Sequence, residues 1–338
     1  MKKIAMASLN ALFAKIAADK KLYLPIEKAG KVDFYEWNEG ETVRLDALKT
    51  VKSAKDVFFP QVENLLKFRV EGKSIEINQA PLCEEDFVIF GVRGCDAKSF
   101  EILDRVFLVD PRDEFYASRR AHGIVVTLAC GEPEESCFCT NFGVNPANPG
   151  GDVTAWIVGE EMFLQANTEK GEKLIAELDE ADKKAAEDEQ ARISEIVKKL
   201  PLNGLNLEGF DGEHLMEKFN DPKWEGLSRA CLGCGTCTFV CPTCQCYDVR
   251  DFDTGNGIQR YRCWDSCMYS DFTLMAHGTN RPTQLERFRQ RFMHKLVYFP
   301  SNNEGLYSCV GCGRCLAKCP QGLHIVKVIK ALGVKDNA

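Results

Sequence analysis

The opening segment of the chain has the apolar spacing of a short amphipathic helix. Its apolar residues recur at intervals of three and four positions: Leu9, Leu12, Phe13 and Ile16. Ser8 precedes the first of them and is a favourable N-cap residue. An export signal would need a continuous apolar run, but Ser8 and Asn10 interrupt this one and Lys15 ends it. We therefore expect a helix here, and a cytoplasmic protein.

Residues 1–165 have the pattern of an α/β domain. Two runs, 87–92 and 124–129, are apolar at nearly every position, which is typical of buried parallel strands. Residues 97–107 between them have a helical pattern, with Asp96 near the N-cap. Shorter β-like segments are expected at 22–25, 32–37, 153–158 and 161–166, the last two as a hairpin.

The composition changes after this domain. Residues 166–204 are rich in Glu, Lys, Asp and Ala, which predicts a charged helical linker that ends near Pro201. Short helices are expected at 213–220 and 224–230. The stretch 205–338 is expected to form a separate domain, and it contains the one internal repeat of the chain.

Charge and cysteine content narrow the possible functions. The net charge of −7 argues against a nucleic-acid binder, and no stretch approaches the roughly 20 apolar residues that span a bilayer. The chain has no GxGxxG after a strand and no P-loop, so no nucleotide site is indicated. Cysteine is strongly over-represented, with 17 among 338 residues. In a reducing cytosol, cysteines in tight runs indicate metal ligation or thiol chemistry.

Two cysteine runs carry the strongest chemical indication. The pattern CxxCxxCxxxCP occurs at 231–242 and again at 309–320. This spacing is that of bacterial-type [4Fe-4S] sites, in which the fourth cysteine of each run ligates the other cluster. The predicted ligands of the first cluster are Cys231, Cys234, Cys237 and Cys319. The predicted ligands of the second cluster are Cys309, Cys312, Cys315 and Cys241.

The alternative to iron–sulfur clusters is a zinc module, since zinc sites also use CxxC pairs. Zinc needs only two such pairs and does not explain the longer pattern occurring twice. The wide separation of Cys241 and Cys309, with a largely helical pattern after Asp265, favours a helical dicluster domain over a compact ferredoxin. The predicted fold class is therefore α+β: an N-terminal α/β domain, a helical linker and a C-terminal α-helical ferredoxin-like dicluster domain.

Four more cysteines follow the two predicted parallel strands. Because open α/β sheets bind ligands at the carboxyl ends of their strands, these thiols could converge on a third [4Fe-4S] cluster. They are Cys95, Cys130, Cys137 and Cys139. The alternative is that they are buried or free thiols of the α/β core. The helix that starts near Asp96 would direct its positive N-terminal end at an anionic cluster.

Several segments together resemble the family of sulfhydrogenase β subunits and anaerobic sulfite reductase A subunits. They are GVRGCDAKSFEILDRVF (91–107), CGEPEESCFC (130–139), CLGCGTCTFVCPTCQCYDV (231–249), RCWDSCMYSDFTLMAHG (262–278) and CVGCGRCLAKCP (309–320). The resemblance implies an electron-transfer subunit of a cytoplasmic anaerobic complex, beside a flavin subunit (FAD, [2Fe-2S]) linked to NAD(P)H. The terminal partner it implies is a hydrogenase, a sirohaem subunit or a heterodisulfide-reductase-like module. At Cys263 some relatives carry another residue, so Cys263 is not assigned as a ligand.

Three cysteines of these segments fit neither ferredoxin set: Cys244, Cys246 and Cys267. They could form a further metal site, serve as alternative ligands or line a redox-active thiol surface; packing around the clusters is the structural alternative. The main prediction is a non-catalytic subunit that relays single electrons. The alternative is a protein that itself reduces disulfides or sulfur through these three thiols.

Overall fold

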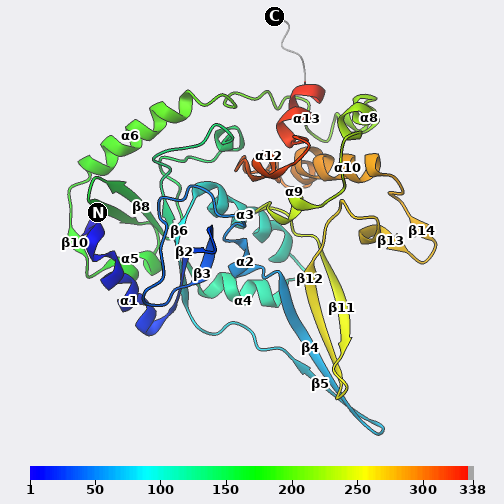
Figure 1. Cartoon of the computed structure of the whole chain (residues 1–338), viewed down its shortest axis with the longest axis horizontal. Coiled ribbons are helices and arrows are strands. Elements are labelled where there is room, and N and C mark those ends of the chain that lie inside the picture. Colours follow the sequence, from blue (N-terminus) through cyan, green and yellow to red (C-terminus); the bar gives the residue numbers. More distant parts are fainter. Residues whose placement is uncertain (334–338) are drawn as a thin grey trace, which may run out of the picture.

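Eight strands form the central sheet of the N-terminal half in the computed structural model, which describes residues 1–333 (Figure 1). The strand order is β10-β1-β9-β8-β7-β6-β2-β3, with β2, β6, β7 and β8 parallel and the outer pairs antiparallel. The strands are β1 (Lys2–Ala5), β2 (Lys21–Lys28), β3 (Lys31–Glu36), β6 (Phe87–Val92), β7 (Gly123–Leu128), β8 (Val153–Val158), β9 (Glu161–Ala166) and β10 (Asp179–Glu180). Mixed helices and sheets, the predicted α+β class, are thus observed.

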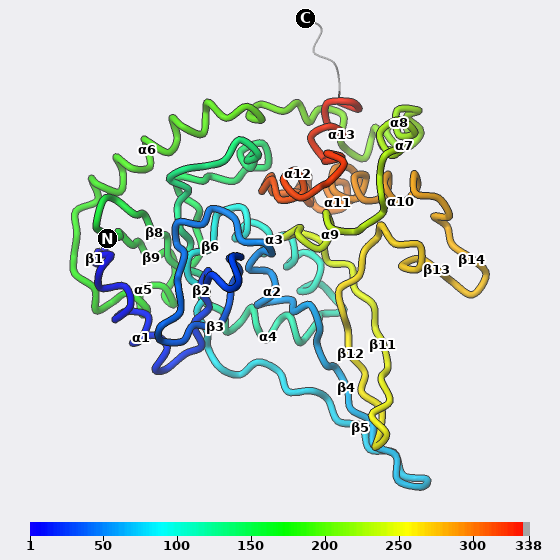
Figure 2. The backbone as a smooth tube through the Cα atoms, in the orientation of Figure 1, coloured from blue at the N-terminus to red at the C-terminus, as the bar shows by residue number. Residues whose placement is uncertain are grey.

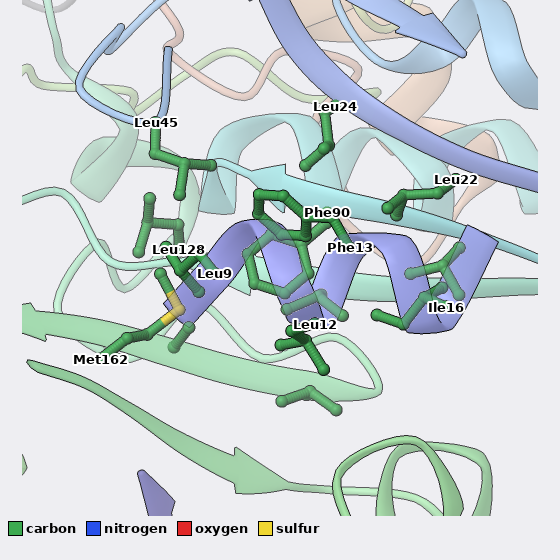
Figure 3. Close-up of a cluster of buried hydrophobic side chains, with 14 of the residues drawn as sticks. Leu9, Leu12, Phe13, Ile16, Leu22, Leu24, Leu45, Phe90, Leu128 and Met162 are labelled. Carbon is green, nitrogen blue, oxygen red and sulfur yellow. The ribbon is translucent and has the colours of Figure 1, made fainter. Parts of the chain in front are cut away.

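Helices cover both faces of this sheet. The covering helices are α1 (Leu9–Asp19), α2 (Lys55–Phe58), α3 (Gly94–Phe107) and α4 (Glu114–His122). Every residue of β6 and β7 is buried, as their unbroken apolar runs predicted. Figure 3 shows Leu9, Phe13 and Ile16 of α1 against Phe90 and Leu24 of the sheet. On the opposite face, the aromatic residues of α3 pack beside α2 and α4. These two layers hold the carboxyl ends of β6 and β7 in place.

The predicted linker is instead packed against the sheet. It consists of α5 (Glu169–Ile175), the short strand β10 and α6 (Lys184–Lys198). Ala186, Ile193 and Val197 of α6 are buried in one cluster with Trp156 and Phe163 of the sheet. The three α6 residues share one helical face, which the many charges around them conceal in the sequence. Residues 166–204 therefore belong to the N-terminal body.

A four-stranded antiparallel sheet projects from the body as an arm (Figure 1). Its strands are β4 (Val62–Glu71), β5 (Ser74–Gln79), β11 (Tyr247–Asp253) and β12 (Ile258–Trp264), in the order β11-β12-β4-β5. It pairs a hairpin from the N-terminal half with one from the C-terminal half, so the sheet crosses the predicted domain boundary. The C-terminal half is consequently not wholly helical, which corrects the prediction for residues 205–338. Both faces of the arm are largely exposed. Its strands therefore lack the alternation of apolar and polar residues by which a half-buried strand is recognised in a sequence.

The rest of the C-terminal half is helical and has its own core. Its helices include α7 (Leu215–Asn220), α8 (Lys223–Ser228), α10 (Gln284–Met293), α11 (Phe299–Asn302) and α13 (Ile325–Leu332), with a π-helical turn at His294–Tyr298 after α10. Phe288, Phe292 and Leu296 pack with Trp224 and Ile329 in this core. The tube in Figure 2 shows α10, α12 (Arg314–Lys318) and α13 close together. No helix in residues 1–333 is long and apolar enough to cross a membrane.

Candidate metal centres

The two cysteine runs fold into matching loops. Each run leads into a short helix, α9 (Thr236–Phe239) in the first and α12 (Arg314–Lys318) in the second. The glycine before each helix has a positive φ, 71° at Gly235 and 77° at Gly313. Because only glycine adopts this conformation readily, the repeat in sequence becomes a repeat in backbone shape. The third cysteine of each run, Cys237 or Cys315, lies in the first turn of its helix.

The structure brings the first predicted ligand set to one cavity. The cavity is lined by Cys231, Cys234, Cys237 and Cys319. The remaining walls are largely apolar, with Met268 and Phe288 among them. Two of the sulfurs accept hydrogen bonds, Cys231 Sγ from Gln284 Nε2 (3.5 Å) and Cys319 Sγ from the backbone N–H of Leu323 (3.2 Å). Such bonds favour a thiolate and therefore fit metal ligation.

The second predicted set also lies together. Burial raises the pKa of Cys309, and the nearby Cys315 and Cys241 add to the shift. Burial likewise raises the pKa of Cys312 to about 12, with Cys241 and Cys315 again among its neighbours. Buried thiols at such pKa values stay neutral at pH 7 when no metal binds them. A positively charged iron would reverse this preference, because ligation requires the thiolate.

The four cysteines predicted for a third cluster line one cavity as well. Its lining includes Cys95, Cys130, Cys137, Cys139 and, from the second cysteine run, Cys312. Cys95 lies in the first turn of α3, directly after β6, and Cys130 lies just beyond the end of β7. Because β6 and β7 are parallel neighbours, their ends place both thiols at the same edge of the sheet. Arg93 and Lys49 also line the cavity and favour an anionic occupant.

The loop of the third cavity packs directly on the second cysteine run. The backbone N–H of Phe138 donates to the carbonyl of Gly311 (3.0 Å). A side chain at Gly311 would collide with the backbone of Phe138, and one at Gly313 with that of Ser136. The two cysteine-bearing loops therefore meet backbone to backbone, with no side chain between them.

A buried ion pair joins the same two parts of the chain. Arg314 donates to both carboxylate oxygens of Asp96, to Oδ2 at 2.8 Å, and it also donates to the carbonyl of Thr50 (3.1 Å). Asp96 is 1% exposed and Arg314 3% exposed, and each stands next to a predicted ligand. The sequence pattern placed Asp96 at a helix start and gave Arg314 no role. Nothing in a single sequence pairs residues 218 positions apart.

Three buried cations surround the thiols of the C-terminal half. Lys55, Arg291 and Lys295 are each at most 2% exposed, and none has a carboxylate within ion-pair distance among residues 1–333. Arg291 donates to the carbonyl of Cys237 (3.1 Å), while its Nε and Nη1 have no partner. Lys295 donates to Thr243 Oγ1 (2.8 Å). Buried charges are normally compensated, so this arrangement fits anionic clusters held by the cysteines.

Lys55 shows the lack of a protein counter-charge most directly. Its Nζ donates to the carbonyls of Cys244 (2.8 Å) and Cys241 (3.2 Å) and lies 3.6 Å from the ring centroid of Trp264. Burial lowers the pKa of Lys55 to about 8. A lysine in the four-residue helix α2 gave no indication of this role in the sequence. Arg291 and Lys295 could have been found, because they share a helical face with the apolar Phe288 and Phe292.

A single-ion site is not formed by the described part of the chain. Among residues 1–333, no three His, Cys, Asp or Glu side chains converge closely enough to hold one metal ion. Tetrahedral zinc would require such convergence, since each Zn–S bond is only about 2.3 Å long. A [4Fe-4S] cluster instead spreads its thiolates over different irons.

The remaining cysteines fall into two kinds. Cys83 lies beside the N-terminal core and its backbone N–H donates to Ser118 Oγ (3.2 Å). Cys263 lies within β12, opposite Val62 and Asp248. Of the other three, Cys244 lies near Cys241 of the second ligand set and near Cys246, and Cys267 lies near Cys246.

Replacing Lys295 by Met should lower the reduction potential of the nearest cluster by about 100 mV. For a separation of about 7 Å and an effective dielectric of about 20, one charge contributes about 2.4 kcal/mol, which is about 100 mV for one electron. The matched control is Lys318→Met, which removes an exposed lysine from α12 and should change the potential by no more than about 20 mV because water screens it. Electron paramagnetic resonance during a potentiometric titration measures both. Equal potentials in the two variants would contradict the assignment of Lys295 as a counter-charge.

Comparison with known proteins is consistent with this geometry. A family model described as a 4Fe-4S dicluster domain matches residues 230–323, which contain both cysteine runs. The sulfhydrogenase 2 subunit beta of Pyrococcus furiosus is 32% identical over 324 residues, covering 94% of this chain and 93% of the relative. No solved structure matches the chain. The four cysteines predicted for a third cluster, Cys95, Cys130, Cys137 and Cys139, lie outside the dicluster match.

Proposed function

The chain belongs to the sulfhydrogenase subunit β family and is an iron–sulfur electron-transfer subunit, and from this we propose that it holds three [4Fe-4S] clusters in series. The first cluster is assigned to Cys231, Cys234, Cys237 and Cys319, and the second to Cys309, Cys312, Cys315 and Cys241. The third is assigned to Cys95, Cys130, Cys137 and Cys139. A bound [4Fe-4S] cluster supplies one-electron redox chemistry at a potential set by its charge, hydrogen bonds and burial.

The observation that carries this proposal is the contact between the loop of the third cavity and the second cysteine run. Cys312, a proposed ligand of the second cluster, also lines the third cavity. Cys237 and Cys315, from the first and second sets, are near enough to influence each other's ionisation. The three sets are thus neighbours in one row. An isolated storage cluster or a structural metal would not need such an arrangement.

The surrounding residues prepare each site for an anion. Arg93 and Lys49 face the third cavity, Lys295 and Lys55 lie beside the second set, and Arg291 lines the first cavity. These fixed cations stabilise the added electron. At the first set, Cys234 is exposed, which offers a surface position where another subunit could exchange electrons.

We propose that the partners are those of the family resemblance. A flavin subunit linked to NAD(P)H would deliver or receive electrons at one end of the row, and a hydrogenase, sirohaem or heterodisulfide-reductase-like subunit would do so at the other. The relative's printed name, a β subunit, supports the presence of other subunits. The tight cysteine runs, which must stay reduced to bind iron, support a reducing, cytoplasmic setting.

Iron and acid-labile sulfide should each amount to about twelve per chain in anaerobically purified protein. Cys139→Ser should reduce both to about eight, because one ligand of the third cluster is lost. Cys83→Ser is the matched control and should keep about twelve, because Cys83 lines neither cysteine cavity. A wild-type value near eight would remove the third cluster and leave the two of the dicluster domain.

Reduction of the chain by different electron donors distinguishes a relay from a catalytic subunit. Dithionite should bleach the visible absorbance of the purified chain, whereas NAD(P)H should do so only after the flavin subunit is added. Oxidation of NAD(P)H by the chain alone, or reduction of a disulfide or of sulfur by the chain alone, would contradict a relay.

A further inference from the structure

The two cysteine runs match in backbone shape but differ in what covers them. Leu232 is 65% exposed, whereas Val310, at the same position of the second run, is 2% exposed. Cys234 is likewise exposed, whereas its counterpart Cys312 is buried. The difference arises because the loop with Phe138 lies backbone to backbone on the second run. The second run is therefore covered by a cysteine-bearing loop of the same chain.

At the corresponding glycines of the first run, the nearest atoms belong to side chains. A Cβ at Gly233 would meet the amide group of Gln284, and one at Gly235 would meet the phenol ring of Tyr269. The hydroxyl of Tyr269 also donates to the carbonyl of Cys234 (3.3 Å). These side chains hold the loop in shape without enclosing its exposed residues. The first run thus keeps a solvent-facing surface directly at an assigned ligand.

This solvent-facing surface has an apolar centre. Leu232, Pro320 and Gln321 line the first cavity, and all three are exposed. A single exposed leucine is common on protein surfaces, but this one stands two positions from the exposed ligand Cys234. A protein that covered Leu232 would bury apolar area and bring its own cofactor close to the first set.

The segments that carry the two runs lack acidic residues, in a chain that is acidic overall. The chain has 50 Asp and Glu residues and a net charge of −7. Residues 226–247 and 305–333 nevertheless contain no Asp or Glu. Their exposed cations include Arg229 and Lys327, and no carboxylate in residues 1–333 lies within ion-pair distance of either. These two positive charges are therefore available to a partner.

Both cations stand at the rim of the first cavity. Arg229 is two positions before Cys231, and the N–H of Cys231 donates to the carbonyl of Ser228 (2.9 Å), which keeps Arg229 in the same turn. The Nζ of Lys327 lies 3.7 Å from the position that a Cβ on Gly322 would take. Gly322 itself lies between two residues that line the cavity. We refer to the following residues together as the first-run surface: Arg229, Leu232, Cys234, Pro320, Gln321 and Lys327.

Compensation of cluster charge does not account for these exposed cations. That role falls to the buried Arg291, which lines the first cavity, whereas water screens a surface charge. Cations around an apolar centre instead attract an acidic partner over a long range and fix its orientation. The second run indicates the kind of partner, because the loop that covers it carries Cys137 and Cys139 of the third set.

We propose that the first-run surface docks an acidic iron–sulfur protein, with which the row of clusters exchanges electrons at Cys234; this rests on the proposed relay function. One electron leaves the iron–sulfur centre of one protein and enters that of the other, so one centre is oxidised as the other is reduced. No covalent bond forms or breaks. The contact belongs to the small, weak class of redox encounters, because its apolar centre is small and its rim is charged.

A purified acidic [2Fe-2S] ferredoxin is the probe for this surface. The full chain with its clusters is immobilised under anaerobic conditions, and the dissociation constant of the oxidised ferredoxin is measured by biolayer interferometry at increasing ionic strength. We expect saturable binding that weakens steadily as salt is added, because salt screens the charges at the rim. No saturable binding at up to about 1 mM ferredoxin in low salt would overturn the proposal.

Charge reversal at the rim locates the binding site. Lys327→Glu and Arg229→Glu should each raise the dissociation constant about tenfold at low salt. Lys67→Glu is the matched control, because it makes the same change of net charge at an exposed lysine of the arm and should leave the constant unchanged. Equal effects of Lys67→Glu and Lys327→Glu would show attraction to net charge alone and would overturn the docking surface.

Truncation at the apolar centre gives an independent reading. Leu232→Ala should raise the dissociation constant about fivefold, because the leucine lies at the centre of the contact. Ile75→Ala truncates another side chain that is 65% exposed, in the arm, and should not change the constant. A Leu232→Ala variant that binds as tightly as Ile75→Ala would contradict an apolar centre at this position and overturn the proposal.

Self-association and cluster content are measured on the same samples. A dimer of the chain that Lys327→Glu dissociates would assign the surface to a second copy and overturn the proposal. A variant that loses iron is set aside, and the salt dependence of wild type and the remaining variants then decide. Full iron content and bleaching by dithionite without ferredoxin binding would remove the docking surface and leave the relay. Failure to bleach would contradict the relay itself, so the two failures are distinguishable.

Discussion

Replacing Asp96 by Ala should lower the free energy of unfolding by about 3–5 kcal/mol, because it leaves the guanidinium of Arg314 buried without its partner. The carboxylate of Asp96 neutralises that charge through two hydrogen bonds, and both side chains are almost fully enclosed. The same change should loosen α3 and its Cys95 from the second cysteine run. Denaturant unfolding followed by circular dichroism measures the loss, and the visible absorbance should fall earlier than the helical signal.

The matched control is an ion pair of similar chemistry at the surface. Asp251 and Arg260 face each other across the arm, with side chains 45% and 41% exposed. Asp251→Ala should cost no more than about 1 kcal/mol, since solvent screens such a pair. The double variant Asp96→Leu with Arg314→Met should recover much of the stability lost in Asp96→Ala, because it removes both buried charges. A loss below about 1 kcal/mol in Asp96→Ala would show that the pair does not hold the two parts together.

The sequence was sufficient to predict the strands that are completely buried and the helix whose apolar residues recur on one face. The runs at 87–92 and 124–129 became β6 and β7, and the hairpin at 153–166 became β8 and β9. The first helix buries the residues that its spacing selected, although Ser8 makes no side-chain hydrogen bond as its cap. In each of these elements, one short stretch of chain contains its own periodic pattern.

The arm and the packing of α6 against the sheet were not predicted, because neither leaves a clear local pattern of apolar residues in the sequence. Strands β4, β5 and β11 expose most of their side chains, including Ile75, Ile77 and Phe252. Neither face of these strands is buried, so their apolar and polar residues do not alternate. Pairing of β4 with β12 joins residues almost 200 positions apart, which no local pattern records. The few apolar residues of α6 were hidden among its charges.

The residues of the candidate sites also divide into those that a local sequence pattern predicts and those that only the folded structure shows. Cysteine spacing selected the ligand sets, because a loop that wraps one cluster leaves its own pattern in the chain. The convergence of Cys95 and Cys130 followed from the rule for parallel strands. The buried cations Lys55 and Arg314 could not be found, since each depends on a partner far away in sequence. Tertiary packing alone determines which lysine or arginine is buried.

Gly311→Ala should destabilise the protein by at least about 3 kcal/mol and remove most of the absorbance of the third cluster. Two costs add together. An alanine at φ +60° pays the left-handed backbone penalty of about 1–2 kcal/mol. Its Cβ would also overlap the carbonyl of Phe138 and the Cα of Cys139, and backbone atoms cannot rotate away as a side chain could. The loop that carries Cys137 and Cys139 must then separate from the second cysteine run.

The control variant Gly30→Ala measures the left-handed backbone penalty alone. Gly30 has a φ of +71° in the turn between β2 and β3, and an added Cβ there meets no atom within 4 Å. This control should lose only about 1–2 kcal/mol and keep about twelve irons per chain. Gly311→Ala should fall to about eight irons, while the resonances of the dicluster domain persist. Equal losses in the two variants would mean that backbone strain explains the effect. The close contact between the two cysteine loops, on which the continuous row of clusters depends, would then lack support.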